Sequence, residues 1–239
     1  HNLPAELRPA VAAAAGHVFV RADLGQIEPR VLAAVSGDPA FAAATRSDDL
    51  YAPVAAKLGV ERPVAKVAVL AAMYGQRSGS AGEALRDLQR AYPVAMRLLD
   101  DAYAAGLARR PLRTFGGRLI PLDRTLTADE QAAPREWLDA ARGRFARNAI
   151  IQGAAAELFK AWALTVRHLL IPLDGQIVLC LHDELLVHVP ANAANTATDV
   201  LHRALADAAR RWLGPTQPGR EVRFVADVCV VNRWDEAKG

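Results

Sequence analysis

Two acidic residues, Asp23 and Asp183, each stand beside short apolar runs of the sequence. Residues 18–22 are mostly β-branched or aromatic and lead into Asp23, while residues 177–181 and 185–189 flank Asp183. Runs of this length and composition are typical of buried strands, so the acids are expected at a strand end and at a hairpin tip. Two carboxylates delivered in this way can hold two divalent cations, which stabilise the attacking and leaving oxygens of a phosphoryl transfer.

The protein ligand set for such cations is expected to be small, because Mg²⁺ keeps several waters and takes further oxygens from substrate phosphates. We expect Asp23 and Asp183 to hold the metals, with the main-chain carbonyl of Leu24 as a further ligand and Glu184 beside them. Taken singly, Asp23 fits better as a helix N-cap and Asp183 as a turn residue. Only their combination with a third motif favours the metal site.

The third motif recurs at four-residue spacing before Gly75 and consists of Arg62, Lys66, Leu70 and Tyr74. On a helix each step turns about 40°, and the stripe spans roughly 18 Å, about the length of an extended nucleotide. Its basic end can hold phosphates and its aromatic end can meet a base, and Lys66 can act as a general acid toward a departing pyrophosphate. On its own the stripe fits a solvated helix start and a core tyrosine equally well. Together with the acids, it indicates attack of a 3′ hydroxyl on a nucleoside triphosphate.

These residues need a scaffold of strands and helices to bring them together. The predicted strands are residues 18–22, 177–181, 185–189 and 222–231, and the predicted helices are residues 27–36, 63–74, 85–107 with an interruption at Tyr92 and Pro93, 136–170 and 193–213. Residues 76–82 are expected to form a loop, and residues 114–119 a hairpin or tight turn. This order predicts an α+β fold, an antiparallel sheet packed on helices, in which Asp23 and Asp183 approach each other across neighbouring strands.

Composition narrows the class of protein without identifying it. The chain has 239 residues, enough to bury a core, and a net charge of +3, which is too small to mark a polyanion binder by itself. Cys180 and Cys229 lack the spacing of a disulfide framework or a zinc site, and no apolar stretch reaches the length of a membrane helix. We therefore expect a soluble, cytoplasmic, monomeric protein. The chain opens at His1 without an initiator methionine, which indicates a fragment whose upstream part is absent.

The three motifs, in this order, resemble motifs A, B and C of the family A DNA polymerases, the group of bacterial DNA polymerase I. Motif A stands here as Asp23-Leu24-Gly25-Gln26-Ile27-Glu28-Pro29-Arg30, motif B as Arg62, Lys66, Leu70 and Tyr74-Gly75, and motif C as His182-Asp183-Glu184. The resemblance continues at Arg144, Asn148, Gln152-Gly153, the turn at residues 114–118 and Trp234. It therefore covers the full length of the chain.

The resemblance implies a DNA-directed DNA polymerase that works on primer–template DNA and dNTPs with two Mg²⁺ ions, for which Mn²⁺ can substitute. It implies a palm at about residues 1–50 and 110–239 and a shortened fingers region at about 51–109, with the thumb and any exonuclease domain belonging to an upstream part. The implied roles are metal binding by Asp23, Leu24 and Asp183, catalysis by these aspartates with Glu184 and Lys66, nucleotide binding by Arg62, Lys66, Leu70, Tyr74, Gln26, Glu28 and His182, and DNA binding by Arg144, Asn148, Gln152, Arg118 and Thr114. Glu28 is expected to crowd the 2′ position of the incoming sugar.

Two departures from the family pattern keep alternatives open. Leu70 replaces an aromatic ring that packs near the incoming sugar in the family, and Leu24 and Gly25 replace the usual Tyr-Ser. A polymerase-derived module that binds primer–template junctions without useful synthesis is one alternative. A two-metal nuclease that uses the same acids is another, although a nuclease has no need of the stripe from Arg62 to Tyr74. The biological role stays open between replication, repair and lesion bypass.

Overall fold

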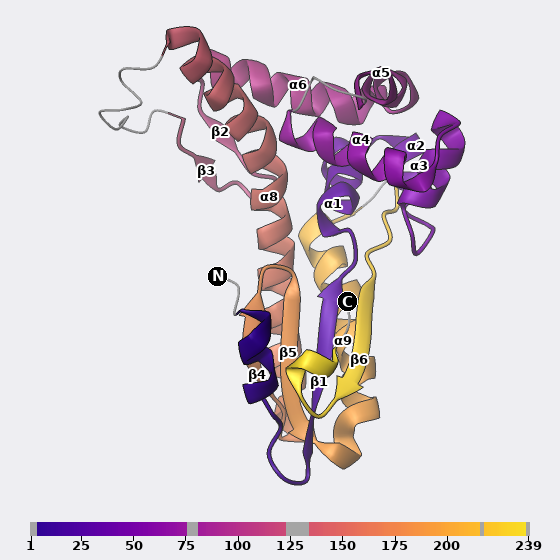
Figure 1. The fold of residues 1–239 in the computed structure, drawn as a ribbon, viewed down its shortest axis with the longest axis vertical. Helices are drawn as coiled ribbons and strands as arrows, with labels where there is room; N and C mark the ends of the chain where they lie inside the picture. Colours follow the sequence, from indigo (N-terminus) through magenta and orange to yellow (C-terminus); the bar gives the residue numbers. More distant parts are fainter. Residues whose placement is uncertain (1–3, 76–80, 123–133, 216–217, 238–239) are drawn as a thin grey trace. The chain divides into compact units, whose positions relative to one another are not determined.

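The chain divides into two compact units, each with its own set of helices and strands (Figure 1). The computed structural model describes residues 4–75, 81–122, 134–215 and 218–237. Unit 1 comprises His1–Ile27, Ala156–Pro215 and Phe224–Gly239, and unit 2 comprises Glu28–Ala155 and Thr216–Arg223. Both acids of the predicted metal site fall in unit 1, and the basic stripe falls in unit 2.

Unit 1 is built on a four-stranded antiparallel sheet. Its strands are β1 (His17–Leu24), β4 (Gln176–Leu181), β5 (Glu184–Pro190) and β6 (Ala226–Val231), in the order β4-β5-β1-β6. The predicted antiparallel sheet is thus confirmed, and β1 occupies an interior position between β5 and β6. An interior strand must be apolar on both faces where both are covered, which explains the aliphatic and aromatic run that precedes Asp23.

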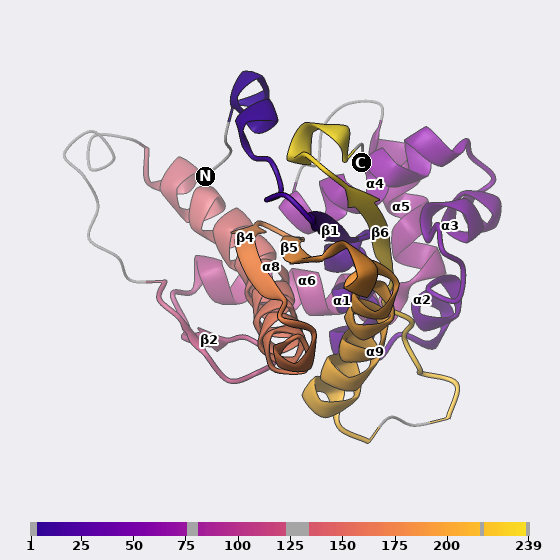
Figure 2. The ribbon, with the colours of Figure 1, turned by 90° about the horizontal axis from the view of Figure 1, so that it is seen from below.

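The two faces of this sheet have different coverings (Figure 2). Helix α9 (Ala194–Leu213) and the C-terminal part of α8 (Arg135–Leu169) lie on one face, where the indole of Trp162 donates a hydrogen bond of 3.1 Å to the Leu201 carbonyl and joins the two helices. The short 3₁₀ helices η1 (Ala5–Ala10) and η4 (Trp234–Glu236) lie on the other face, where Trp234 packs with Phe19 and Leu186. Short 3₁₀ helices η2 (Ile171–Leu173) and η3 (Ala191–Ala193) connect the longer elements.

Unit 2 is mainly helical. It contains α1 (Ile27–Ser36), α2 (Pro39–Ala44), α3 (Tyr51–Leu58), α4 (Arg62–Tyr74), α5 (Ala81–Ala91), α6 (Pro93–Leu107) and the N-terminal part of α8, with a small hairpin of β2 (Leu112–Arg113) and β3 (Leu119–Ile120). The buried carboxylate of Asp38 accepts hydrogen bonds from the start of two helices, Ala40 and Phe41 in α2 and Val94 and Ala95 in α6. One side chain therefore accepts from two of the free N–H groups at each of the two helix ends.

Several boundaries differ from the sequence prediction. The last strand begins at Ala226 and not at residue 222, because the Arg223 N–H is donated to the Thr45 hydroxyl at 3.1 Å instead of to a strand. Glu184 is the first residue of β5, not part of the hairpin tip. The helices α2 and α3 were not predicted, since each is too short for its periodicity to stand out.

Other predicted elements agree with the structure. The break at Pro93 is confirmed, because α5 ends at Ala91 and α6 begins at Pro93. Residues 76–80 of the predicted loop lie outside the described residues, and residues 81–82 are not loop, because α5 begins at Ala81. Among the helices that are described, none combines the length and the apolar character needed to cross a membrane.

Candidate active site

A row of three carboxylates crosses the sheet of unit 1. Asp23 on β1 is paired with Glu184 on β5 and with Asp227 on β6. Residues paired across antiparallel strands point to the same face, with side chains about 5 Å apart. Asp23 lies on the face that carries Phe19 and Trp234, because side chains alternate along a strand. Three acids in one row must repel one another unless cations lie among them.

One such cation is a side chain of the protein itself, Arg21. The guanidinium of Arg21, only 5% exposed, lies 3.0 Å from Asp23 Oδ2 and 2.9 Å from Glu184 Oε2. The other carboxylate oxygen of Glu184 accepts a 2.6 Å hydrogen bond from the indole of Trp234. Both oxygens of Glu184 are therefore bonded to protein groups, and the glutamate is an internal counter-ion of Arg21.

Asp23 differs from Glu184 in its electrostatics. Burial raises the pKa of Asp23 to about 6, and the nearby charge of Asp183 raises it further than Arg21 lowers it. The main chain fixes this proximity, since the Leu24 N–H donates a 3.0 Å hydrogen bond to the Asp183 carbonyl. A carboxylate whose charged form is disfavoured by burial and by a second carboxylate is stabilised when a divalent cation binds between them.

The turn that carries Asp183 has an unusual backbone. His182 has a φ of 51°, in the left-handed region that favours glycine, at the first position of a two-residue turn between β4 and β5. Its ring lies 3.2 Å from the Asp183 carboxylate, measured from Nδ1 to Oδ1. Gln26, after β1, has a similar φ of 56°. Strain of this kind persists where the surrounding structure fixes the chain, and here it occurs at two predicted nucleotide-binding residues.

The donor set fits Mg²⁺ better than a softer metal. Within the described part of the chain, no three side chains of histidine, cysteine, aspartate or glutamate converge as a ligand cluster. The donors that the sequence predicted, the Asp23 and Asp183 carboxylates and the Leu24 carbonyl, are all oxygen atoms. Hard oxygen donors that leave room for water and phosphate suit Mg²⁺ or Mn²⁺.

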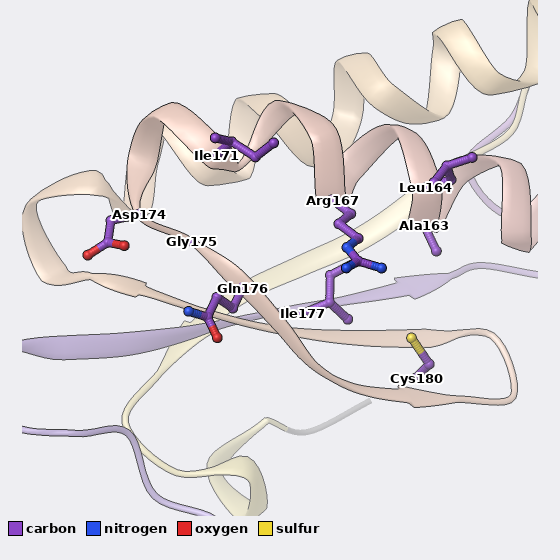
Figure 3. A pocket seen from close by; sticks show the side chains of 9 residues that line it. All are labelled: Ala163, Leu164, Arg167, Ile171, Asp174, Gly175, Gln176, Ile177 and Cys180. Carbon is purple, nitrogen blue, oxygen red and sulfur yellow. The ribbon is translucent and has the colours of Figure 1, made fainter.

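A hollow of about 850 Å³ in unit 1 is separate from these acids (Figure 3). Figure 3 shows Arg167 on α8 directed toward Ile177 on β4, with Cys180 further along the strand. Ile177 and Cys180 are paired with Val187 and Leu185, and these two residues are paired in turn with Val20 and Ala22 of β1. The hollow thus lies on the helix-covered face of the sheet, opposite the face of Asp23, and is no part of the acidic site.

In unit 2, helix α4 presents the predicted stripe on one side and buries the other. Arg62, Lys66 and Tyr74 are exposed and Leu70 is half-buried. The opposite side is formed by small or apolar residues that are almost wholly buried, namely Ala65, Ala68, Val69, Ala72 and Met73. The helix ends at Gly75, whose φ of 72° continues the chain in a left-handed cap. The four-residue spacing therefore does produce a continuous face.

Arg62 already has an acidic partner in unit 2. Its Nε and Nη2 atoms donate to the carboxylate of Asp49 at 2.6 and 3.2 Å, and the guanidinium lies 5.7 Å from the Tyr51 ring centre. Burial raises the pKa of Tyr51 to about 12, and the charge of Glu28 acts in the same direction. Lys66, one turn further along α4, is exposed to solvent.

The C-terminal end of α4 meets two other predicted residues. The Tyr74 hydroxyl donates a 3.3 Å hydrogen bond to Glu28, and it also bonds to Gln152 on α8. Burial and the Glu28 charge raise the pKa of Tyr74, so the phenol remains neutral and can donate. Three residues that are far apart in the sequence are thereby joined in unit 2.

The remaining predicted DNA-binding residues line α8 and the β2–β3 hairpin. A Cβ atom on Gly75 would lie 3.1 Å from the Arg144 side chain, so α4 and α8 touch there. A Cβ on Gly153 would come within 2.4 Å of Thr114 and 3.2 Å of Arg118, so glycine is required where the hairpin crosses α8. The hairpin itself is closed by the Arg118 N–H, which donates to the Thr114 hydroxyl at 3.0 Å. Arg144, Asn148 and Gln152 lie along one helix, as the spacing predicted.

Three groups beside the predicted residues were missed from the sequence. Arg21 and Asp227 share the sheet face of Asp23, and Asp49 binds Arg62. A charged residue inside an apolar strand run, two positions before an acid, is a signal that could have found Arg21. Asp227 and Asp49 depend on strand register and on loop geometry, for which the sequence carries no comparable signal.

Comparison with known proteins confirms the family resemblance that the sequence motifs indicated. A family model described as DNA polymerase family A matches residues 2–236. The chain is 33% identical to DNA polymerase I of Chloroflexus aurantiacus over 91% of its own length and 25% of the relative, and 28% identical to the thermostable DNA polymerase I of Thermus filiformis over 97% of its length and 29% of the relative. It thus spans about a quarter of these relatives.

A solved structure shows the same fold. The POL domain of Pol1 from M. smegmatis, in complex with DNA primer-template and dNTP, superposes with a TM-score of 0.76 at 24% identity, covering 97% of this chain and 42% of the other. At this level of identity the likeness concerns the fold alone. The family model, matched over nearly the whole sequence, establishes the relationship: the chain belongs to DNA polymerase family A.

Proposed function

We propose that this chain supplies the palm and fingers of a DNA-directed DNA polymerase that transfers a nucleotide from a dNTP to a primer 3′ hydroxyl on a template. The observation that carries the proposal is the proximity of Asp23 to Asp183, which the hydrogen bond from the Leu24 N–H to the Asp183 carbonyl fixes; burial, together with the charge of Asp183, raises the pKa of Asp23 to about 6. Membership of the family supports the reaction class, and the position of this pair supports unit 1 as the part that would hold the metals.

In this proposal Asp23 and Asp183 are the carboxylates that hold two Mg²⁺ or Mn²⁺ ions, with the Leu24 carbonyl as a further oxygen donor. When bound, such ions activate the 3′ hydroxyl and neutralise charge on the phosphates. Glu184 would act on the metal site only indirectly, because its oxygens are bonded to Arg21 and Trp234. Its role is to hold Arg21, which in turn fixes the orientation of Asp23.

The residues of α4 would serve the incoming nucleotide. Arg62 and Lys66 are exposed cations one turn apart and would bind the triphosphate, Arg62 by exchanging Asp49 for a phosphate. Lys66 would also donate a proton to the departing pyrophosphate. Tyr74, held by Glu28 and Gln152, would lie against the new base pair, and Glu28 would limit the space at the sugar 2′ position. Leu70, Gln26 and His182 would complete the nucleotide contacts.

The nucleic acid would run along α8 and the β2–β3 hairpin. Arg144, Asn148 and Gln152 combine one cation with two amides that both donate and accept, which suits phosphate and minor-groove contacts. Thr114 and Arg118, at the crossing with Gly153, would add contacts from the hairpin. These groups read the shape of a duplex more than its sequence.

The test is primer extension by the full polymerase carrying Asp183→Asn, with Asp227→Asn as the matched control. Both changes remove one carboxylate from the same region of unit 1, but only the first removes a proposed metal ligand. We expect Asp183→Asn to lower the extension rate by at least about 10³-fold, and Asp227→Asn by less than about tenfold. An Asp183→Asn enzyme that extends primers at the unmutated rate would refute the mechanism.

The engagement of Arg62 by Asp49 and the presence of Leu70 favour one second candidate, a module that binds primer–template junctions without synthesis. Tight junction binding by the unmutated protein without dNTP-dependent extension, with Mg²⁺ or with Mn²⁺, would select this candidate. Metal-dependent degradation of the primer without dNTPs would instead indicate a nuclease.

A further inference from the structure

Helix α8 carries an exposed aromatic residue in line with the proposed DNA-binding residues. Arg144, Asn148 and Gln152 follow Trp137 by 7, 11 and 15 residues. At 100° per residue these intervals place all four within an arc of about 80° on the helix surface. Trp137 is 55% exposed, and Phe145, on the edge of the same face, is 52% exposed. The stripe of polar residues therefore continues into a tryptophan toward the N-terminal end of α8.

The opposite side of this part of α8 is occupied by protein. A Cβ on Gly143 would come within 2.7 Å of the Tyr103 ring, and one on Gly106 would lie 2.8 Å from Ala146, so α6 and α8 pack at close range. Ala146 also packs with Ile120 of the β2–β3 hairpin. Because α6 and the hairpin cover the opposite side, Trp137 is exposed among the residues of unit 2 that the structure describes, and the end of α4 lies against the stripe only further along α8, at Arg144 and Gln152.

Contacts within unit 2 relate Trp137 to the proposed templating position. Gln152 is bonded to Tyr74, and Arg144 lies against Gly75, so this part of the stripe is beside the residue proposed to meet the new base pair. Fifteen residues of helix separate Gln152 from Trp137, a rise of roughly 22 Å. That is the length of about six stacked nucleotides of one strand.

Charge on this part of the helix is compatible with a phosphate backbone. The acid nearest to Trp137 on its C-terminal side, Asp139, is bonded to Arg142 at 2.6 Å and lies 3.9 Å from Arg109. Its charge is thus compensated. Arg135 and Glu136, directly before Trp137, are exposed and opposite in charge, and Arg144 adds a cation to the stripe. An exposed indole in line with a cation and two amides resembles the combination of aromatic and basic groups with which proteins stack unpaired bases.

From these observations we infer that Trp137 is a stacking platform for an unpaired base of the template strand, several nucleotides beyond the primer end. The inference rests on the proposed polymerase function and extends it to the single-stranded part of the substrate. Phe145 widens the apolar surface next to the platform. A lone exposed aromatic residue would need no explanation, but one aligned with the DNA-binding stripe at nucleotide-scale separation has a specific ligand.

The experiment compares full polymerase with its Trp137→Ala and Trp137→Phe variants for binding to labelled primer–templates, measured by fluorescence anisotropy without dNTPs. The templates have 5′ overhangs of one nucleotide or ten. We expect Trp137→Ala to weaken binding to the long overhang about tenfold and to leave the short overhang unchanged. Trp137→Phe should retain most of the affinity, because a phenyl ring also stacks. Leu107→Ala, which removes another exposed apolar side chain of unit 2, is the matched control and should change neither.

Two outcomes would overturn the inference: unchanged binding of Trp137→Ala to the long overhang, or an equal loss on both substrates, which would mean a contact with the duplex or with protein. Extension of the short-overhang substrate separates this result from the broader proposal. If the unmutated protein extends that substrate while Trp137→Ala binds both overhangs normally, only the stacking inference fails. If the unmutated protein neither binds nor extends primer–templates, the polymerase function itself fails.

Discussion

Charged side chains are held in different ways on the acidic face of unit 1 and on the basic face of α4 in unit 2. In unit 1 the charges are carried by strands, tied by main-chain hydrogen bonds, and compensated by Arg21, which is almost wholly buried. In unit 2 the cations are at the end of long, exposed side chains, and Arg62 has an acid that a ligand can replace. Metal ligands need a fixed geometry, whereas side chains that bind a mobile triphosphate need to be long and free to move. The contrast predicts that removing the buried cation of the first region is costly, whereas removing an exposed cation of the second is cheap.

The largest effect is expected for Arg21→Met, which keeps the apolar stem of the side chain and removes the charged guanidinium. Glu184 and Asp23 would lose their internal cation while remaining partly buried, and breaking a buried ion pair in this way costs about 3 kcal/mol of unfolding free energy. Urea denaturation of the two proteins measures the difference. Arg21→Lys keeps the charge and should recover part of the loss. A stability of Arg21→Met equal to that of the unmutated protein would remove the contrast between the two regions.

In unit 2 the largest loss of stability is expected at an acid that acts by capping helices. Asp38→Ala removes the acceptor for the N-termini of both α2 and α6, and each lost cap costs about 1 kcal/mol, giving roughly 2 kcal/mol in total. Asp38→Asn keeps an oxygen that can cap one helix and should lose about half as much. Thermal unfolding followed by circular dichroism gives both values. If the alanine variant is as stable as the asparagine variant, the oxygen that asparagine keeps contributes nothing, and only one of the two helix caps stabilises the protein.

Asp23→Asn is expected to stabilise the protein when divalent cations are absent. The folded-state pKa of Asp23 is raised to about 6 against an ordinary value of 3.8, so the folded state binds the proton more tightly than the unfolded state. Ionisation of Asp23 therefore makes stability fall as pH rises from about 4 to about 6, and the whole penalty is present at pH 7. After allowance for solvent screening, the gain from Asp23→Asn at pH 7 is on the order of 1 kcal/mol.

The check on Asp23 is the difference in unfolding temperature between the two proteins as a function of pH, in a chelator. The difference should vanish below about pH 4 and reach its full value above pH 6. Added Mn²⁺ should stabilise the unmutated protein and not Asp23→Asn, because only the native carboxylate pair binds the ion. A constant difference between pH 4 and pH 7 would contradict the raised pKa.

The smallest effect is expected for Arg62→Met, the counterpart of Arg21→Met in unit 2. Arg62 is half-exposed and its pair with Asp49 is screened by solvent, so its removal should change the unfolding free energy by no more than about 0.5 kcal/mol. The same urea titration used for Arg21→Met makes the comparison direct. A loss of stability as large as that of Arg21→Met would show that the Arg62–Asp49 pair stabilises the fold and does not serve mainly to bind a ligand.

The sequence predicted the elements that have strong local patterns. The apolar run before Asp23, the repeat of polar residues on α8 and the proline break before α6 each appear where the local pattern placed them. What it did not predict depends on register and on loops. Nothing in the sequence states that Arg21 and Glu184 share a face of the sheet, because that follows from the pairing of β1 with β5.

Arg30 is a second example. It is fully buried in unit 2, where it donates to the carbonyls of Thr45, Ser47, Asp48 and Arg223, and burial lowers its pKa to about 10. A motif in the sequence contains this arginine but does not show that it fixes a loop.

The central claim is that Asp23 and Asp183 share cations, and a titration of the protein with Mn²⁺, followed by calorimetry without DNA, tests it most directly. The account predicts binding that is lost in both Asp23→Asn and Asp183→Asn and retained in Asp227→Asn. Equal Mn²⁺ binding by the unmutated protein and by both single variants would contradict it.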